Sequence, residues 1–247
     1  MTYSIVLTMS GVLAASVLRG FTGFGFGLAA VPLLSIALPP AAVVPLVVVL
    51  QVLVGLGGLR EAWPLCDWRA VRLLFPGLVL GVPIGLLILI SLAPNPVRLL
   101  IGLVIAFSVL LLHRGARLAP HPSWLVTGGV GVVSGMISGL ASMGGPPIIV
   151  YLMARGDGPH RVRATAMVYF MLAGCVTFVP MLARGLITRE TLILTAACLP
   201  VLYGGSWLGT IAFRRAQPRH HRLTALVTLS ALATLLIGRT LWSMLGS

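Results

Sequence analysis

The sequence predicts an all-α protein that crosses a membrane many times and is built from two related halves. Hydrophobic residues make up 58% of the chain and charged residues 9%, the mean hydropathy is +1.08, and apolar runs near the length of a bilayer recur throughout. Glycine- and proline-rich interruptions break this apolar sequence near the start of each half, at 20–32 and 135–147. Broken apolar segments at corresponding positions of two halves point to a transporter's binding site.

Hydropathy divides the chain into eight apolar runs, from which we expect about 8 to 10 membrane segments. The first and fifth runs are too long for one crossing, because a helix of about 36 residues would extend about 54 Å, against a hydrocarbon core of about 30 Å. Each has its glycine break near the middle, so we expect a helix pair or a hairpin that turns back. The runs are 3–38, 41–59, 72–91, 99–112, 124–153, 164–183, 191–213 and 223–242.

The arginine distribution predicts the orientation. Arg supplies all 17 basic residues, against four carboxylates, for a formal net charge of +13. In a soluble protein this balance would suggest nucleic acid, but here Arg lies mainly in short loops, as expected of cytoplasmic anchors beside anionic lipid. If both long runs go in and return, one side of the membrane receives most of the Arg residues. We therefore expect cytoplasmic loops at 60–72, 113–123, 154–163 and 214–222, with both termini periplasmic.

This topology makes the halves inverted transmembrane repeats, 1–118 and 119–247, each with a Gly/Pro-broken first segment and three further helices. Corresponding small residues support the repeat, although they could also recur by chance in glycine-rich membrane helices. The matches are Gly20 with Gly135, Ala29 with Gly144, Pro32 with Pro147, Gly81 with Gly205, Gly85 with Gly209 and Arg98 with Arg222.

At these residues the chain resembles the sulfite exporter TauE/SafE family. Residues 135–152, with the core Ser-Gly-Leu-Ala-Ser-Met-Gly-Gly-Pro-Pro, are similar to the second signature of that family, and 20–34 to the first. The resemblance covers essentially the whole chain. It implies a bacterial inner-membrane permease that moves small sulfur-containing anions, such as sulfite or organosulfonates, generally outward. We expect no cofactor, no metal and no nucleic-acid partner.

The residues at the breaks also suit an anion in their own right. Backbone N–H groups freed at a break and the positive end of a half-helix can hold an oxyanion, and Ser and Thr hydroxyls can donate to it. The same hydroxyls also serve helix packing, and Tyr is a common interface anchor. The candidate substrate-binding residues are Arg19, Thr22, Gly23, Gly25, Gly27, Gln51, Ser138, Ser142, Gly144, Gly145 and Tyr151.

Arg19 is the most distinctive candidate. It directly precedes the first break, with apolar sequence on both sides, and its counterpart in the second half is Ser134. A guanidinium can grip an oxyanion with two parallel hydrogen bonds, and an ionisable group within a membrane run is a functional candidate. Arg19 is alternatively an anchor at the cytoplasmic surface.

Other classes meet specific obstacles. All four carboxylates fall in predicted loops, which argues against cation transport. An intramembrane serine hydrolase would need a general-base His, and all five His lie in predicted loops or at run ends, so we expect no enzyme. A drug or metabolite exporter of another inverted-repeat family would accept neutral or cationic compounds, and its transport would not depend on Arg19. A noncatalytic membrane subunit would show no flux alone.

Overall fold

A computed structural model describes residues 2–23, 25–35, 38–114 and 122–215, and every regular element in these ranges is helical. The predicted run 223–242 and most of two predicted cytoplasmic loops, 113–123 and 214–222, lie outside the described residues. The elements are α1 (Thr2–Thr22), α2 (Phe26–Ser35), α3 (Pro40–Ala62), the 3-10 turn η1 (Trp63–Leu65), α4 (Trp68–Ser91), α5 (Pro94–Arg114), α6 (Trp124–Ala141), α7 (Gly145–Ala154), α8 (Pro159–Ala183) and α9 (Arg189–Arg215).

The helical membrane class predicted from hydropathy is confirmed. Within the described ranges, five helical segments are long and apolar enough to cross a membrane: Pro40–Leu65, Trp68–Ser91, Trp124–Ala141, His160–Ala183 and Arg189–Ala212. Two shorter apolar helices, α2 and α7, have ten residues each. The total of 8 to 10 membrane segments stays a prediction.

Both long apolar runs are broken at the expected glycine-rich positions. The long helix ends in left-handed backbone in each case, at Gly23 with φ +80° and at Ser142 with φ +54°. A left-handed residue after the last helical turn lets the chain leave the helix axis. The short helix then starts three residues later, at Phe26 in the first half and at Gly145 in the second.

Each short helix turns back along the long helix before it. Near the second break the Ser134 hydroxyl donates to the Gly144 carbonyl at 2.6 Å. Farther from the break, the hydroxyls of Thr127 and Tyr151 lie 2.9 Å apart. These two bonds pair the residues of α6 and α7 in opposite chain order. In the first half, Gly11 of α1 lies against the last turn of α2. Both breaks are therefore helical hairpins.

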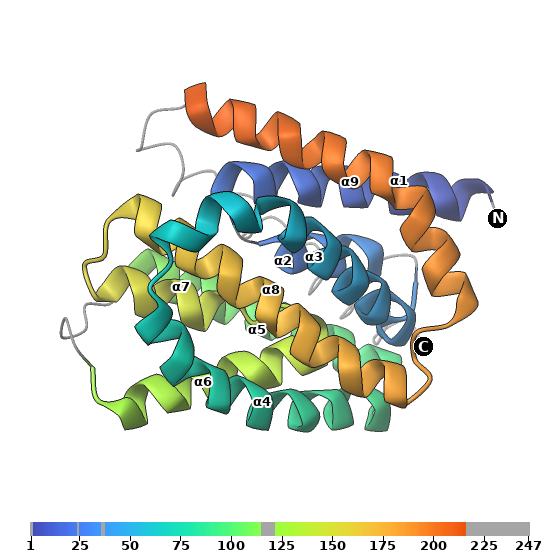
Figure 1. Cartoon of the computed structure of the whole chain (residues 1–247). Coiled ribbons are helices and arrows are strands. Elements are labelled where there is room, and N and C mark those ends of the chain that lie inside the picture. Colours follow the sequence, from blue (N-terminus) through green and yellow to red (C-terminus); the bar gives the residue numbers. More distant parts are fainter. Residues whose placement is uncertain (1, 24, 36–37, 115–121, 216–247) are drawn as a thin grey trace.

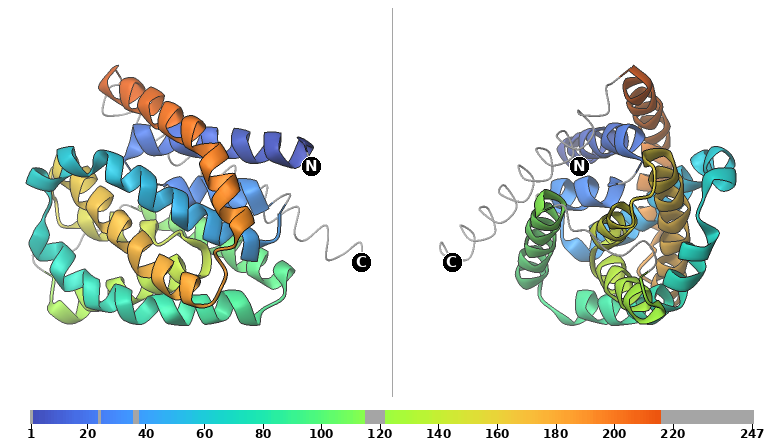
Figure 2. Two further views of the ribbon diagram at one scale, coloured as in Figure 1. Left: turned by 45° about the vertical axis from the view of Figure 1, so that its right-hand side comes forward. Right: turned by 90° about the vertical axis from the view of Figure 1, so that its left-hand side faces the viewer.

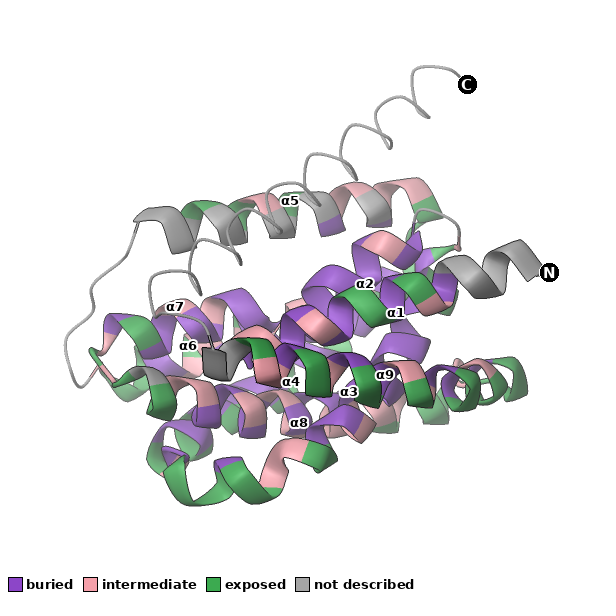
Figure 3. Cartoon of the chain, turned by 90° about the horizontal axis from the view of Figure 1, so that it is seen from above, coloured by how far each residue is buried: buried purple, intermediate pink, exposed green. Residues whose placement is uncertain are grey.

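The long helices pack in three pairs (Figure 1). Helices α1 and α9 lie side by side along one edge of the bundle, α4 and α6 lie along the opposite edge, and α3 and α8 lie between them. Helix α5 stands to one side (Figure 2) and exposes much of its surface, whereas α2 and α7 are largely buried (Figure 3).

Glycine permits the close approach within these pairs. A Cβ on Gly85 of α4 would meet the backbone of Met136 and Leu140, and a Cβ on Gly209 of α9 would meet the backbone of Val17 and Phe21. Between α3 and α8, Gly55 lies against Met171 and Gly174 lies against Val52. The earlier residue of α3, Val52, contacts the later residue of α8, Gly174, and Gly55 contacts the earlier Met171. Helices α3 and α8 therefore run antiparallel.

These contacts correct one expected register. Gly23 and Ser142, each of which follows the long helix before a break, are separated by 119 residues (23 to 142), and so are Gly55 and Gly174. At that separation Gly20 corresponds to Gly139 and not to Gly135. The sequence match was displaced by one helical turn because small residues recur every fourth position here, as at 131, 135 and 139. Gly81 and Gly85 pack against α6, and Gly205 and Gly209 pack against α1; their match as repeat positions stays a prediction.

Candidate anion-binding site

The two breaks meet in the interior of the bundle. Between them lies a narrow crevice of about 20 Å³. Seven of the eleven residues predicted from the sequence line it, although they come from four different helices and the turns between them. These seven are Arg19, Gly25, Gly27, Gln51, Ser142, Gly144 and Gly145.

The Gln51 side chain lines the crevice and links the second break to α8. Ser142 Oγ donates to Gln51 Oε1 at 3.3 Å, and Gln51 Nε2 donates to the carbonyl of Phe170 at 3.2 Å. Gly27 packs so closely on the Ser142 carbonyl that a Cβ would not fit. A space of this size accommodates about one water molecule. A sulfonate group therefore requires the two breaks to separate.

A larger cavity of about 290 Å³ adjoins the crevice. Arg19 lines both spaces and is only 8% exposed. Within the part of the chain that the structure describes, no carboxylate lies within ion-pair distance of its guanidinium. A buried cation without a protein counter-ion favours the approach of an anion.

Two further charged residues line the same cavity, and the sequence analysis placed both in loops. Arg163 lies near the start of α8, and its Nη2 donates to the Gly20 carbonyl at 3.2 Å. Glu61 lies in the last turn of α3. Helices α3 and α8 extend beyond the apolar runs 41–59 and 164–183, and these extensions carry the charges to the cavity. The expectation that every carboxylate lies in a loop is therefore wrong for Glu61 and for Glu190, which lies in the first turn of α9.

The remaining predicted residues take other positions. Gly23 lines the larger cavity and packs against the side chain of Arg163. Thr22 donates to the carbonyl of Leu18 within its own helix, at 2.8 Å. Ser138 is buried, with its hydroxyl against Gly144. Tyr151 is bonded to α6, as described above, and belongs to neither lining. In this conformation Tyr151 thus contacts α6, and its part in substrate binding stays a prediction.

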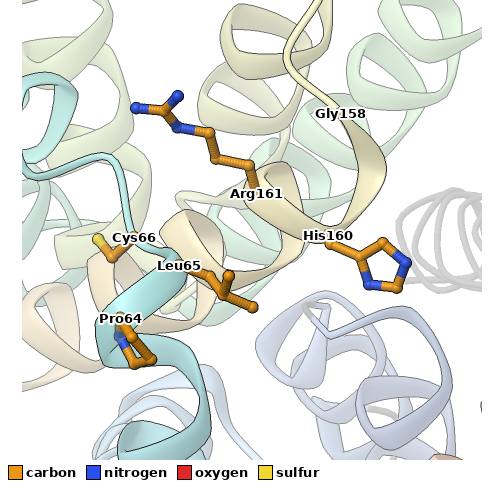
Figure 4. A pocket seen from close by; sticks show the side chains of 6 residues that line it. All are labelled: Pro64, Leu65, Cys66, Gly158, His160 and Arg161. Carbon is orange, nitrogen blue, oxygen red and sulfur yellow. The ribbon is translucent and has the colours of Figure 1, made fainter.

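A third cavity, of about 420 Å³, lies where η1 meets the start of α8 (Figure 4). Arg161 extends past Cys66 in this view, whereas His160 points away from it. Burial raises the pKa of the Cys66 thiol to about 11, which disfavours the reactive thiolate. This cavity is separate from the two breaks.

Beside this cavity, Asp67 joins the two halves of the chain. Its carboxylate accepts hydrogen bonds from the backbone N–H groups of Arg69 and Ala70, at the start of α4. It also forms an ion pair with Arg155 at 2.7 Å and lies 3.8 Å from Arg161. Burial alone would raise the pKa of Asp67, but the Ala70 N–H and the two guanidinium groups outweigh it and hold that pKa below its ordinary value of 3.8.

Comparison with known proteins gives one consistent family. The family model described as sulfite exporter TauE/SafE matches residues 7–236. A protein of Cupriavidus necator named probable sulfite/organosulfonate exporter TauE is 28% identical over 206 residues, covering 79% of each chain. The probable inner membrane transporter protein TsaS of Comamonas testosteroni is 29% identical over 167 residues, covering 66% of this chain and 70% of that protein. No solved structure matches.

Proposed function

The chain belongs to the sulfite exporter TauE/SafE family, and we propose that it exports small sulfur-containing anions, sulfite or organosulfonates, across a bacterial inner membrane. Its membership makes it a membrane transporter and not an enzyme. The observation that carries the proposal is the position of Arg19, which lies between the narrow crevice and the larger cavity. A cation at that point can hold an oxyanion before the breaks separate.

The proposed architecture is a pair of inverted repeats, 1–118 and 119–247, related by a pseudo-two-fold axis in the membrane plane. The equivalent helices α3 and α8 support it, because their contacts run antiparallel about Gly55 and Gly174. The outer pairs support it as well, since α1 packs on α9 in the way that α6 packs on α4. In transporters of this kind the site lies between the repeats, near the membrane centre.

The described conformation corresponds to a state open toward the cytoplasm. The larger cavity is bounded by the end of α3, the start of α8 and the later part of α9. These helix ends adjoin the Arg-rich loops that the positive-inside rule assigns to the cytoplasm. An anion would move from this cavity past Arg19 to the breaks. Outward movement would then be driven by an inside-negative potential, which supplies about 2.3 kcal/mol per charge per 100 mV.

The crevice supplies the groups that would hold and release the anion. Arg19 provides the charge, and the glycines of both breaks, Gly25, Gly27, Gly144 and Gly145, allow backbone to approach the substrate closely. Gln51 and Ser142, which share a hydrogen bond at the crevice, would exchange that bond for bonds to substrate oxygens as the breaks separate. Thr22, Gly23 and Ser138 would support the break backbone around them.

The test is flux from proteoliposomes that contain only the purified protein. We expect saturable flux of sulfite and small organosulfonates, with no flux of chloride or of a neutral amino acid. Arg19→Gln should reduce that flux by at least about tenfold, the loss of one charged hydrogen-bonding partner, while inserting normally. Arg189→Gln, an exposed site at the start of α9, is the matched control and should transport like the unmodified protein.

Two results would contradict the proposal. Flux of neutral or cationic compounds, unaffected by Arg19→Gln, would identify an exporter with wide substrate tolerance. Absence of all flux from well-inserted protein would indicate a subunit that needs a partner or a transporter of another substrate class.

A further inference from the structure

Two guanidinium groups from opposite halves of the chain face one cavity. Arg19 comes from α1 and Arg163 from α8, and both line the space of about 290 Å³ beside the crevice. The Nη2 of Arg163 is bonded to the carbonyl of Gly20, the residue that follows Arg19, at 3.2 Å. A guanidinium has five N–H donors in a planar fork, so one such bond does not by itself exhaust it. The two cations therefore act on the same cavity.

One carboxylate lines this cavity as well. Glu61 lies at the mouth, on the exposed end of α3. In the part of the chain that the structure describes, it lies beyond ion-pair distance from both arginines. The negative charge of Glu61 therefore contributes to the electrostatic potential of the cavity, although Glu61 forms no ion pair with either arginine. Within the described part of the chain, the side chains with formal charges that line the cavity are thus two cations and one anion.

The other polar side chains of the described lining, Tyr203, Ser206, Trp207 and Thr210, are neutral. The hydroxyl of Tyr203 donates to the carbonyl of Leu53 at 3.0 Å. The hydroxyl of Thr210 donates to the carbonyl of Ser206 at 2.9 Å. Neither bond changes the charge, so among the residues that the structure describes Arg19, Arg163 and Glu61 determine the formal charge of the cavity lining, which is +1.

From this count we infer that the cavity selects singly charged oxyanions over doubly charged ones. In this inference Arg163 is a second anion-binding residue. The charge of Glu61 limits the neutralised charge on the anion to one. One negative charge neutralises the described lining, whereas a second would remain uncompensated beside the buried Arg19. The inference rests on the proposed function and narrows its substrate class. For sulfite, which exists near neutral pH as both HSO3⁻ and SO3²⁻, the transported species would be HSO3⁻.

Equilibrium binding to the purified protein tests the inference, with methanesulfonate as the singly charged probe and sulfate as the doubly charged one. The unmodified protein should bind methanesulfonate more tightly than sulfate. Glu61→Gln should shift the ratio of the two affinities toward sulfate by at least about tenfold, the order expected for one charge several ångströms away. Glu190→Gln, which removes an exposed carboxylate at the first turn of α9, should leave the ratio unchanged.

Arg163 is tested by restoring the charge. Arg163→Gln should weaken methanesulfonate binding by at least about tenfold. The double variant Glu61→Gln, Arg163→Gln returns the lining to +1 and should recover part of that loss. If Arg163 only supports the break backbone, the double variant will bind as weakly as the single one. That result, or an unchanged affinity ratio in Glu61→Gln, would overturn the inference.

The two proposals fail in different ways. Charge-dependent binding without any flux would leave the inference standing and contradict the export function. Sulfonate flux that is unchanged in both Arg163→Gln and Glu61→Gln would support the export function and contradict the inference. Absence of both binding and flux would contradict both.

Discussion

At the residue scale, Asp67 is the carboxylate with the most partners in the described structure. It caps α4 through two backbone N–H groups and pairs with Arg155, which belongs to the other half of the chain. Its side chain is only 6% exposed. A charge this deeply buried is tolerated because it is both paired and hydrogen-bonded. Asp67 therefore stabilises the junction between the α3–α4 and α7–α8 turns.

The lowered pKa of Asp67 makes a prediction about acid stability. A carboxyl whose pKa is lower in the folded than in the unfolded chain stabilises the fold above the unfolded value. That contribution is lost as the pH falls from about 3.8 through the folded pKa. Asp67→Asn should lower the free energy of unfolding at neutral pH by about 3 kcal/mol, since it leaves Arg155 without its closest partner.

Thermal unfolding of the detergent-purified protein across a pH series would measure this effect. The melting temperatures of the unmodified protein and of Asp67→Asn should converge at acidic pH, where Asp67 is protonated. Glu190→Gln should follow the unmodified protein throughout. A constant gap between the two curves down to the lowest pH would show that the carboxylate charge is not what stabilises this junction.

The candidate site shows which residues sequence reasoning can and cannot find. Arg19 could be predicted because it interrupts an apolar run, and the glycines because they break one. Arg163 and Glu61 could not, since each lies just outside an apolar run and resembles an ordinary loop charge. Only the extra turns of α3 and α8, together with the pairing of the two halves, bring them to the cavity. The contact of the Tyr151 hydroxyl with α6 could not be predicted either, because Thr127 lies 24 residues away in sequence.

At the element scale, the close pairs of helices depend on glycine. Gly139 of α6 lies against α4, where a Cβ would meet the carbonyl of Val82 and lie 2.8 Å from the amide nitrogen of Leu86. Helix–helix association in a membrane relies on such close packing, because lipid offers no hydrophobic driving force between helices. The same helix contains Gly129, around which a Cβ would find nothing within 4 Å.

These two glycines form a matched pair for a test of the packing. Ala exceeds Gly in helix propensity by about 1 kcal/mol, so Gly129→Ala should leave thermal stability unchanged or raise it. Gly139→Ala gains the same propensity but forces α4 and α6 apart, and overpacking of this kind costs about 1–3 kcal/mol. The melting temperature should therefore fall for Gly139→Ala alone. Equal behaviour of the two variants would mean that the α4–α6 contact is looser than the structure shows.

At the scale of the whole molecule, composition predicted the helical membrane class, and the length of the broken runs predicted a helix pair or a hairpin at each break. The structure shows a hairpin at both breaks. The register between the two breaks could not be predicted. Glycines spaced four residues apart satisfy the packing pattern at more than one register, so Gly20 could be matched equally well to Gly135 or Gly139. The left-handed turns at Gly23 and Ser142 distinguish these alternatives, because a break has only one position in each half. Backbone conformation therefore distinguishes the two registers, whereas residue identity alone does not.

The orientation of the molecule is the remaining prediction, and the two ends of α8 provide the test. His160 and Ala183 are both exposed and lie at opposite ends of this helix. In a background with the three native cysteines replaced by serine, His160→Cys should react with a membrane-impermeant maleimide only after the cytoplasmic face is opened. Ala183→Cys should react in intact spheroplasts. Thr210→Cys, in the 290 Å³ cavity, should follow His160→Cys and be protected by sulfonate. The reverse pattern would place the Arg-rich ends outside, and an anion in this cavity would then be positioned for uptake and not for export.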